Sequence, residues 1–589
     1  MNLSEDFKLQ QVKLKENIQF LIECNKLEEA SNIIAEYETM INNDIDVYSF
    51  KAVIAIMQNR NEDAMEILLK ALDFDVNNAD ILYNLGYIFE SKKEYKNAYT
   101  YYRKAKKNTK DEQLMLQIDS VMHELEKLPV IQDYIKSKKV LFIAYYFPPI
   151  GSSGVQRSLK YVKYLKQYGW DPIVVTVKND DSNTIFTKKD ETFLNEIPDE
   201  TQIVRIDMPT SISSNHIKEV IDLACGLIND KGLKEEYFNY IEKYKTLDFI
   251  LRPDVYILWA NNVIKQIEKC VDFDDIDIIY TTSSPYSDHV AGFFLKQHYN
   301  KPWVADFRDE WSNNCYARRN KNDIIYKFDY SMEEKIVNYA DKIITTTPLS
   351  SDNYRNIFNL DNEKVITITN GYDEDDFQNL EIISNNDKFT MIHNGVLYSV
   401  RTPETFFQAV SNLLKKGLID KNKFKIYMGP TDDDDRWKKL SKELLLEDNI
   451  EFLGYLNHKD SLRLAAKVDS LLLIVGSEKR TGAVYPGKLF EYLRLNKPIL
   501  SLSPIGGVVD KLIKDLDRGF NIEFLDVEGI EKAYLNMYQM WKDGKLKSYN
   551  TTENIMQFDR KVLTKRLVAL FDELTNKDTK NIELIEGKN

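Results

Sequence analysis

From residue 138 onward, short apolar runs alternate with segments of helical spacing. The runs are rich in branched residues and contain few charges, which is typical of strands buried on both faces of a parallel sheet. Such alternation predicts doubly wound α/β domains, whose ligands bind at the carboxyl ends of the strands. The strands expected in a first domain lie at residues 139–145, 173–177, 203–206, 278–282, 303–306, 343–346 and 365–368.

The same pattern starts again near residue 389 and predicts a second α/β domain. Its expected strands lie at residues 389–392, 424–427, 450–453, 471–475, 499–503 and 520–524. We therefore assign residues 138–377 and 388–550 to two Rossmann-like domains. An amphipathic helix is expected within the C-terminal segment 551–577.

The stretch TGAVYPGKLFEYLRLNKPIL, residues 481–500, predicts a glycine loop that leads from a buried strand into a short helix. Gly482 and Gly487 break the chain in this loop, and the free amides at a helix start can hold phosphate. Lys488 lies in the first helical turn, with Glu491 one turn further on and facing the same way. A cation for a diphosphate beside a carboxylate for a ribose diol suits a nucleotide sugar.

Two other interpretations of this stretch stay open. Residues 482–488 also spell G-x-x-x-x-G-K, the phosphate-loop pattern of ATPases, but Leu489 stands where a Ser or Thr would hold magnesium. The stretch could equally be an ordinary strand-to-helix turn in which Lys488 and Glu491 are solvated.

Glycines also follow the first expected strand of the first domain. The sequence FPPIGSSG, residues 147–154, precedes an expected helix over 155–168. Gly151 and Gly154 would let backbone amides approach a ligand. The spacing differs from the dinucleotide pattern G-x-G-x-x-G, so by itself it identifies no cofactor.

Residues 1–130 have helical spacing and a repeat of 34 residues, which Ala30, Ala64 and Ala98 share. This pattern resembles the tetratricopeptide repeat, in which small residues let two helices approach closely. About three repeats are expected, capped by one amphipathic helix over 110–135. Such stacks bind a peptide or a partner protein. A plain helical bundle is the alternative.

Composition limits the partners and the compartment. The net charge of −14 over 589 residues argues against non-specific binding to nucleic acid or to an anionic membrane. The four cysteines lie far apart and indicate neither disulfides nor a zinc cluster. We find no signal-peptide pattern and no apolar run of membrane-spanning length. A cytoplasmic protein that is not integral to a membrane is therefore expected.

Several motifs are long enough to indicate a family. They are FPPIGSSGVQR at 147–157, TTSSPYSDH at 281–289, WVADFRDEW at 303–311 and NGYD at 370–373. Together they resemble family-4 glycosyltransferases of bacterial glycan assembly, and the resemblance extends over about residues 138–575. It implies the GT-B architecture, in which two Rossmann-like domains face a cleft, the second holds the nucleotide sugar, and a C-terminal helix returns to the first.

The resemblance also implies roles for residues of the second domain. Gly395 begins a stretch that looks like the first-strand loop of the donor domain, and Arg401 in that stretch would pair with the diphosphate. A solvated Arg401 is the alternative. Glu491 fits the glutamate that hydrogen-bonds the ribose. Ala483 stands where a glutamate that contacts the donor sugar is common, so the identity of the sugar stays open.

On the first domain, the resemblance points to the end of the expected strand 303–306. Many relatives place a histidine near the sugar there, and the matching position falls on Arg308 and Asp309, with Asp306 as a support. A structural ion pair is the alternative for these residues. His289, at an expected helix start, is a further catalytic candidate.

We therefore expect a glycosyltransferase, a hexosyltransferase, that moves a sugar from a nucleotide sugar with retention and needs no metal ion. A UDP-sugar is the expected donor. The repeats suggest a protein Ser or Thr as acceptor, for example in flagellin or a surface protein. A lipid-linked or cell-envelope glycan is the alternative acceptor. A non-catalytic repeat scaffold is a third hypothesis, motivated by Ala483.

Overall fold

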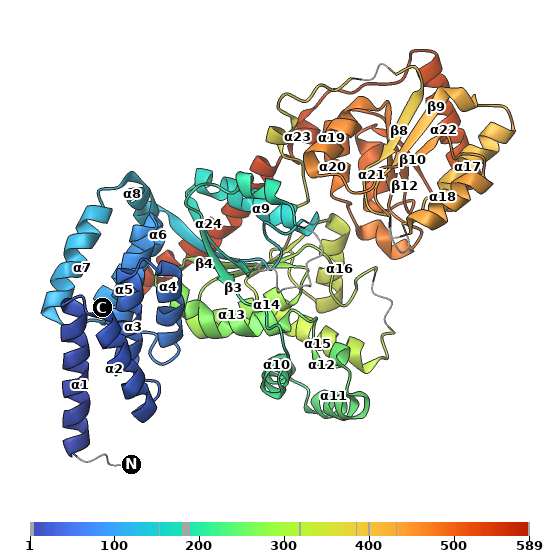
Figure 1. Ribbon diagram of the computed structural model, residues 1–589. Helices are drawn as coiled ribbons and strands as arrows, with labels where there is room; N and C mark the ends of the chain where they lie inside the picture. Colours follow the sequence, from blue (N-terminus) through green and yellow to red (C-terminus); the bar gives the residue numbers. More distant parts are fainter. Residues whose placement is uncertain are drawn as a thin grey trace.

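The computed structural model describes residues 5–151, 153–178, 189–316, 320–383, 386–397, 401–431 and 433–586. Figure 1 shows three parts in a row: a helical region, a first α/β domain in the middle and a second α/β domain at the other end. The doubly wound fold class predicted from the alternating apolar runs is confirmed.

The helical region consists of antiparallel helices that pack in pairs. They are α1 (Glu5–Glu23), α2 (Leu27–Met40), α3 (Ile45–Met57), α4 (Asn61–Ala71), α5 (Ala79–Ser91), α6 (Tyr95–Asn108), α7 (Glu112–Leu125) and α8 (Pro129–Lys136). Ala30, Ala64 and Ala98 are completely buried. Gly86 of α5 lies so close to α6 that an added Cβ would come within 2.7 Å of the Tyr102 ring. Small residues therefore allow the close approach expected of the repeats.

The segment expected as one helix over 110–135 is two helices, α7 and α8. Pro129 is the first residue of α8. Proline lacks the amide that would continue a preceding helix but fits the first position of a new one. The chain therefore turns at this proline before it enters the first sheet.

The first α/β domain contains a seven-stranded sheet in the order β3-β2-β1-β4-β5-β6-β7. Its strands are β1 (Lys138–Ile143), β2 (Trp170–Val177), β3 (Gln202–Ile206), β4 (Ile278–Ser283), β5 (Trp303–Phe307), β6 (Lys342–Thr345) and β7 (Val365–Thr367). Its helices are α9 (Ser153–Leu165), α10 (Ser214–Gly226), α11 (Lys231–Tyr244), α12 (Leu247–Ile250), α13 (Ile257–Cys270), α14 (Ser287–Tyr299), α15 (Ile324–Tyr339) and α16 (Pro348–Phe358), with the 3₁₀ helices η1 (Lys166–Tyr168), η2 (Glu191–Glu196) and η3 (Glu374–Phe377). All seven strands match expected runs.

The second α/β domain contains a six-stranded sheet in the order β10-β9-β8-β11-β12-β13. Its strands are β8 (Phe389–His393), β9 (Phe424–Met428), β10 (Ile450–Phe452), β11 (Ser470–Ile474), β12 (Ile499–Leu502) and β13 (Gly519–Ile522). Its helices are α17 (Glu404–Lys415), α18 (Asp434–Glu443), α19 (His458–Lys467), α20 (Lys488–Arg494), α21 (Val508–Asp515), α22 (Val527–Lys542) and α23 (Glu553–Met556), with η4 (Lys421–Lys423) and η5 (Lys479–Ala483). Every pairing in both sheets is parallel.

Apolar side chains alternate between the two faces of each sheet. In β1, Leu141 and Ile143 belong to one core and Val140 and Phe142 to another. Side chains of a strand point alternately to opposite faces, so each sheet is buried on both sides by helices. The catalytic or binding groups of such a domain must therefore lie at the strand ends.

The last helix, α24 (Arg560–Glu586), leaves the second domain and packs on the first. Leu563, Leu567 and Phe571 of α24 lie in the same core as Phe142 of β1. Where the chain crosses between the domains, the backbone of Tyr372 pairs with that of residues 558–560. Two adjacent crossings therefore join the domains.

The helical region docks on the edge of the first sheet where the strands begin. Lys96 of α6 forms an ion pair with Asp171 at the start of β2, and both side chains are almost fully buried. Arg103 pairs with Asp272 at 3.1 Å in the loop before β4. The ligand-binding edge of the same sheet, where the strands end, lies on the opposite side. Among the described residues, no helix combines the length and the apolar character needed to cross a membrane.

Candidate active site

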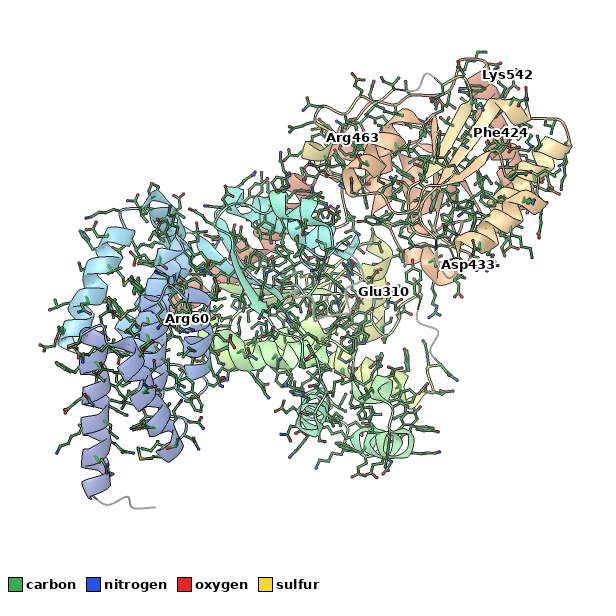
Figure 2. The ribbon with its side chains drawn as sticks, viewed as in Figure 1. Arg60, Glu310, Phe424, Asp433, Arg463 and Lys542 are labelled. Atoms are coloured by element: carbon green, nitrogen blue, oxygen red, sulfur yellow. The ribbon has the colours of Figure 1, made fainter. Side chains whose placement is uncertain are left out.

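A cleft of about 1140 Å³ lies between the two α/β domains. In the first domain it is lined by segments that follow β1, β5, β6 and β7, and in the second by segments that follow β8, β10 and β11. Figure 2 shows Glu310, one of the lining residues, on the side of the first domain that faces the second. Nine of the residues expected from the sequence line this cleft: Gly151, Gly154, Arg308, Asp309, Gly395, Arg401, Gly487, Lys488 and Glu491.

Lys488 begins α20, and its ammonium group lies directly over Gly395 in the loop after β8. A Cβ added to Gly395 would come within 1.1 Å of Lys488 Nζ. Burial and the positive charge of Arg401 lower the pKa of Lys488 to about 7, although Glu491 acts in the opposite direction. The chemistry of this position is that of a half-buried amine that gains a counterion when an anion binds.

Glu491 lies on the same helix and is held by a residue that the sequence reasoning missed. His458 Nε2 lies 2.8 Å from Glu491 Oε1. Burial alone would lower the pKa of His458, but the Glu491 carboxylate outweighs it and raises this pKa to about 9. The pair holds Glu491 ionised, since its pKa is lowered by His458 against the effect of burial.

Arg308 links two of the segments that form the first-domain wall of the cleft. Its Nη1 donates to the Gly154 carbonyl oxygen at 2.9 Å, and a Cβ on Gly154 would come within 2.5 Å of that nitrogen. Asp309 Oδ2 lies 3.5 Å from Arg308 Nε. Gly151 lies against Asp190, because a Cβ added to Gly151 would come within 3.1 Å of the Asp190 amide nitrogen. Gly154 therefore makes room for the Arg308 side chain, and Gly151 for the chain at residues 189–190, instead of for a ligand.

Several contacts cross the cleft, and two of them involve residues singled out from the sequence. Arg401 of the second domain donates from Nη2 to the hydroxyl oxygen of Tyr316 in the first. Thr347 Oγ1, at the start of α16, donates to the carbonyl oxygen of Ala483 at 2.8 Å. Ala483, at the position where a glutamate is common in the family, thus accepts a hydrogen bond from the opposite domain through its backbone carbonyl oxygen.

Two expected residues lie outside the cleft. His289 is completely buried at the start of α14, where its Nδ1 lies 2.7 Å from Thr281 Oγ1 and burial lowers its pKa to about 3. It is a neutral core histidine without access to the site. Gly482 is buried against another loop, because an added Cβ would lie 3.5 Å from the Gly507 Cα. This glycine allows loop packing rather than approach to a ligand.

Asp306 does not line the cleft, and its carboxylate binds Arg157 rather than Arg308 or Asp309, which it was expected to support. It is completely buried and accepts from Arg157 Nε at 2.6 Å and from Arg157 Nη2 at 3.1 Å. Arg157 also donates to the carbonyl oxygens of residues 368 and 369. The pair therefore ties α9 and β5 to the segment that crosses into the second domain.

Glu310 is a second residue that the sequence reasoning missed. Burial raises the pKa of its carboxyl, and Asn353 Nδ2 donates to it at 2.9 Å. It follows Asp309 directly in the motif quoted for the family resemblance, so its position next to the strand end was a usable signal.

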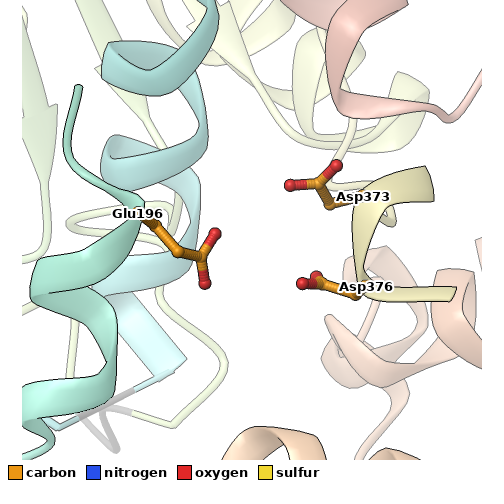
Figure 3. Close-up of side chains that lie close together, drawn as sticks. All are labelled: Glu196, Asp373 and Asp376. Atoms are coloured by element: carbon orange, nitrogen blue, oxygen red, sulfur yellow. The ribbon is translucent and has the colours of Figure 1, made fainter. Parts of the chain in front are cut away.

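Three carboxylates, Glu196, Asp373 and Asp376, lie close together (Figure 3), and Asp373 and Asp376 are among the residues that line the cleft. Their oxygens lie within 4.8 Å of one another. The ammonium group of Lys160 pairs with all three, at 2.8 Å from Asp373 and 3.0 Å from Asp376. A buried lysine thus supplies the positive charge that these carboxylates require.

Comparison with known proteins agrees with this geometry. Residues 228–376 match the model described as Glycosyltransferase Family 4, and residues 374–552 match that described as Glycosyl transferases group 1. Residues 79–111 match a tetratricopeptide repeat. None of the curated proteins compared with the chain matches it.

The chain is also similar to solved structures at low sequence identity. Sucrose-phosphate synthase from Thermosynechococcus elongatus is 13% identical, with a TM-score of 0.50 over 75% of this chain and 100% of that chain. A glycosyltransferase from Rickettsia africae is 14% identical, with a TM-score of 0.47 over 74% and 98%. An O-GlcNAc transferase from Thermobaculum terrenum is 9% identical, with a TM-score of 0.40 over 98% and 100%.

Two parallel sheets that face one cleft, together with the two family matches, define a glycosyltransferase of the GT-B type. The chain is a nucleotide-sugar-dependent enzyme of this type, in which a tetratricopeptide-repeat region precedes the two α/β domains.

Proposed function

We propose that the enzyme transfers a sugar with retention at the anomeric carbon, that it needs no metal ion, and that its donor is a UDP-sugar. The observation that carries the assignment of the donor site is the convergence of Lys488, Glu491 and Arg401 on one wall of the cleft. Arg308 and Asp309 lie in the same cleft on the first domain.

The proposed reaction breaks the bond between the anomeric carbon and the β-phosphate oxygen. The acceptor hydroxyl oxygen forms the new bond to that carbon, and its proton passes to the departing phosphate. Negative charge develops on the diphosphate, so Lys488 and Arg401 would stabilise the transition state more than the bound donor. Glu491 would accept hydrogen bonds from the ribose. Arg308 and Asp309 would lie on the acceptor side, close to the reacting sugar.

The acceptor that we propose is a Ser or Thr of a protein bound by the repeats. Its support is the 34-residue period and the match at residues 79–111. A lipid-linked or cell-envelope glycan is the second candidate. One observation favours it: the repeats dock at the strand-start edge of the first sheet. A partner bound there need not be the molecule that enters the cleft.

A donor screen tests the proposal. Purified protein is incubated with UDP-, GDP-, ADP-, CDP- and dTDP-sugars, and hydrolysis and thermal shift are measured. A donor present at 100 times its Kd should add about 2.7 kcal/mol of stability. We expect UDP-sugars to bind and to be hydrolysed slowly, and Lys488→Gln and Glu491→Gln to abolish both effects. Lys565→Gln, at an exposed position on α24, serves as the control.

The same donor is then offered with protein and with lipid-linked glycan acceptors, and products are identified by mass spectrometry. Sugar on Ser or Thr would support the protein acceptor, whereas a lengthened glycan would favour the second candidate. Nucleotide binding without turnover of any donor would contradict both and indicate a scaffold.

A further inference from the structure

Arg560 occupies an unusual place at the boundary between the domains. It is the first residue of α24, where the chain returns from the second domain to the first. Its amide donates to the carbonyl oxygen of Tyr372 at 2.8 Å, and the amide of Tyr372 donates to the carbonyl oxygen of Phe558 at 3.1 Å. The backbone of Arg560 is therefore fixed by the neighbouring crossing segment.

The side chain of Arg560 lines the cleft although it is only 4% exposed. Its Nη1 has no hydrogen-bond partner among the described residues. Burial, together with the charge of Arg157, lowers the pKa of Arg560 to about 10. Arg157 itself is paired with Asp306, so that carboxylate is already in use. A buried guanidinium donor without a partner is costly unless a ligand completes it.

Glu491 supplies the complementary half of the site. His458 occupies Oε1, and no other hydrogen bond to this carboxylate occurs in the described part of the chain. Arg560 attracts Glu491 electrostatically, but the two side chains form no ion pair. A guanidinium can only donate and a carboxylate can only accept, whereas a hydroxyl group does both.

An anionic ligand group would suit Arg560 alone but would be repelled by Glu491. Lys488 and Arg401, the cations expected to bind the diphosphate, influence each other electrostatically, and Glu491 also acts on Lys488, so the space between Arg560 and Glu491 adjoins the expected diphosphate site. A neutral diol satisfies both Arg560 and Glu491, and a ribonucleotide carries such a diol next to its phosphates.

We propose that Arg560 binds the ribose of the donor, with Nη1 donating to a ribose hydroxyl oxygen whose proton is donated to Glu491. The site would thereby select ribonucleoside over 2′-deoxyribonucleoside diphosphates. This inference rests on the proposed nucleotide-sugar function. It also assigns to α24, which lies outside the second α/β domain, a contact with the nucleotide-sugar donor.

The test compares affinities for paired nucleotides in the full-length protein. UDP, GDP, ADP and CDP are titrated by calorimetry, and the one that binds most tightly is compared with its 2′-deoxy form. We expect the wild-type protein to bind the deoxy form about tenfold or more weakly, since hydrogen bonds to charged groups are the strong ones. Arg560→Gln should weaken binding of the ribonucleotide at least tenfold and bring the ratio of the two Kd values close to one.

Arg560→Lys keeps the positive charge but lacks the planar guanidinium. We therefore expect the logarithm of its ratio of Kd values, deoxy form over ribo form, to be less than half of the wild-type value. Lys565→Gln, five residues further along α24 at an exposed position, should leave both affinities unchanged. The ratio is measured on the folded fraction of each variant, so partial unfolding cannot imitate its loss.

Two results would overturn the inference in distinguishable ways. If Arg560→Gln binds the nucleotide with the wild-type ratio, the inference fails and the proposed function stands. If the wild-type protein binds none of the four nucleotides, the inference about Arg560 and the proposed function fail together.

Discussion

Lys488 lies against Gly395 in the loop after β8 as a half-buried amine whose pKa is about 7 in the ligand-free protein. A bound diphosphate should raise this pKa, so the complex binds more protons than the free protein above pH 7. We therefore expect nucleotide affinity to fall as the pH rises from 7 to 9. Calorimetry in buffers of different ionisation enthalpy should show proton uptake on binding. Lys488→Gln should remove the proton uptake assigned to this side chain, and unchanged uptake would contradict this assignment.

His458 gives a pH dependence of folding stability rather than of nucleotide affinity. Its pKa in the folded protein, about 9, lies above the ordinary value of 6.5. The ion pair with Glu491 therefore stabilises the fold fully below pH 6.5, and this contribution is lost as the pH rises through 9. We expect His458→Gln to lower the free energy of unfolding by about 1–3 kcal/mol at pH 6.5 and by much less at pH 9.5. Urea unfolding measures the difference.

His123→Gln, at an exposed position on α7, is the control for His458. An equal loss for His458→Gln at both pH values would show that packing, rather than charge, sets its effect.

At the scale of elements, the two adjacent crossings between the domains depend on Gly371. An added Cβ there would come within 2.1 Å of the Phe558 carbonyl oxygen and 2.6 Å of a Leu563 methyl group. We expect the methyl group of Gly371→Ala to push the two crossing segments apart and to lower the free energy of unfolding by about 1–3 kcal/mol. Gly232→Ala in α11, where only the Asp230 carboxylate comes within 4 Å, should change stability little. Urea unfolding and hydrogen exchange at residues 371–373 check the difference.

The strands were predictable because each combines a branched apolar run with burial on both faces, as in residues 471–475. The helix boundary at Pro129 was visible in the sequence but was outweighed by the continuous amphipathic pattern over 110–135. Apolar periodicity and proline positions are set by residues close together in the chain. The order of helices and strands can therefore be predicted from the sequence.

Contacts between distant residues were not predictable in the same way. His458 lies 33 residues before Glu491, and only the packing of α19 beside α20 brings them together. Gly482 and Gly487 have the same appearance in sequence, yet the position of Gly507 decides that the first faces a loop and the second the cleft. A catalytic histidine and a core histidine could both stand at the start of a helix. Only the burial of His289 shows that it belongs to the core.

At the scale of the whole molecule, the buried ion pair Lys96–Asp171 joins the repeats to the first α/β domain. Removal of one partner leaves a buried charge uncompensated, so we expect Lys96→Met to cost about 3–5 kcal/mol. The double variant Lys96→Met/Asp171→Leu should recover most of this loss. Lys106→Met, which breaks a half-exposed pair with Asp119, should cost less than about 1 kcal/mol. A double-mutant cycle by urea unfolding tests these values.

The place where the repeats dock has a consequence for how a substrate is chosen. Because they are fixed to the edge of the first sheet where the strands begin, while the cleft opens where the strands end, a bound chain would have to run past the thickness of a whole domain before it reached the reacting sugar. Under the proposed protein acceptor, the enzyme would act as a ruler. The modified hydroxyl would be set by its distance along the acceptor from the anchored segment, with little dependence on the residues next to it.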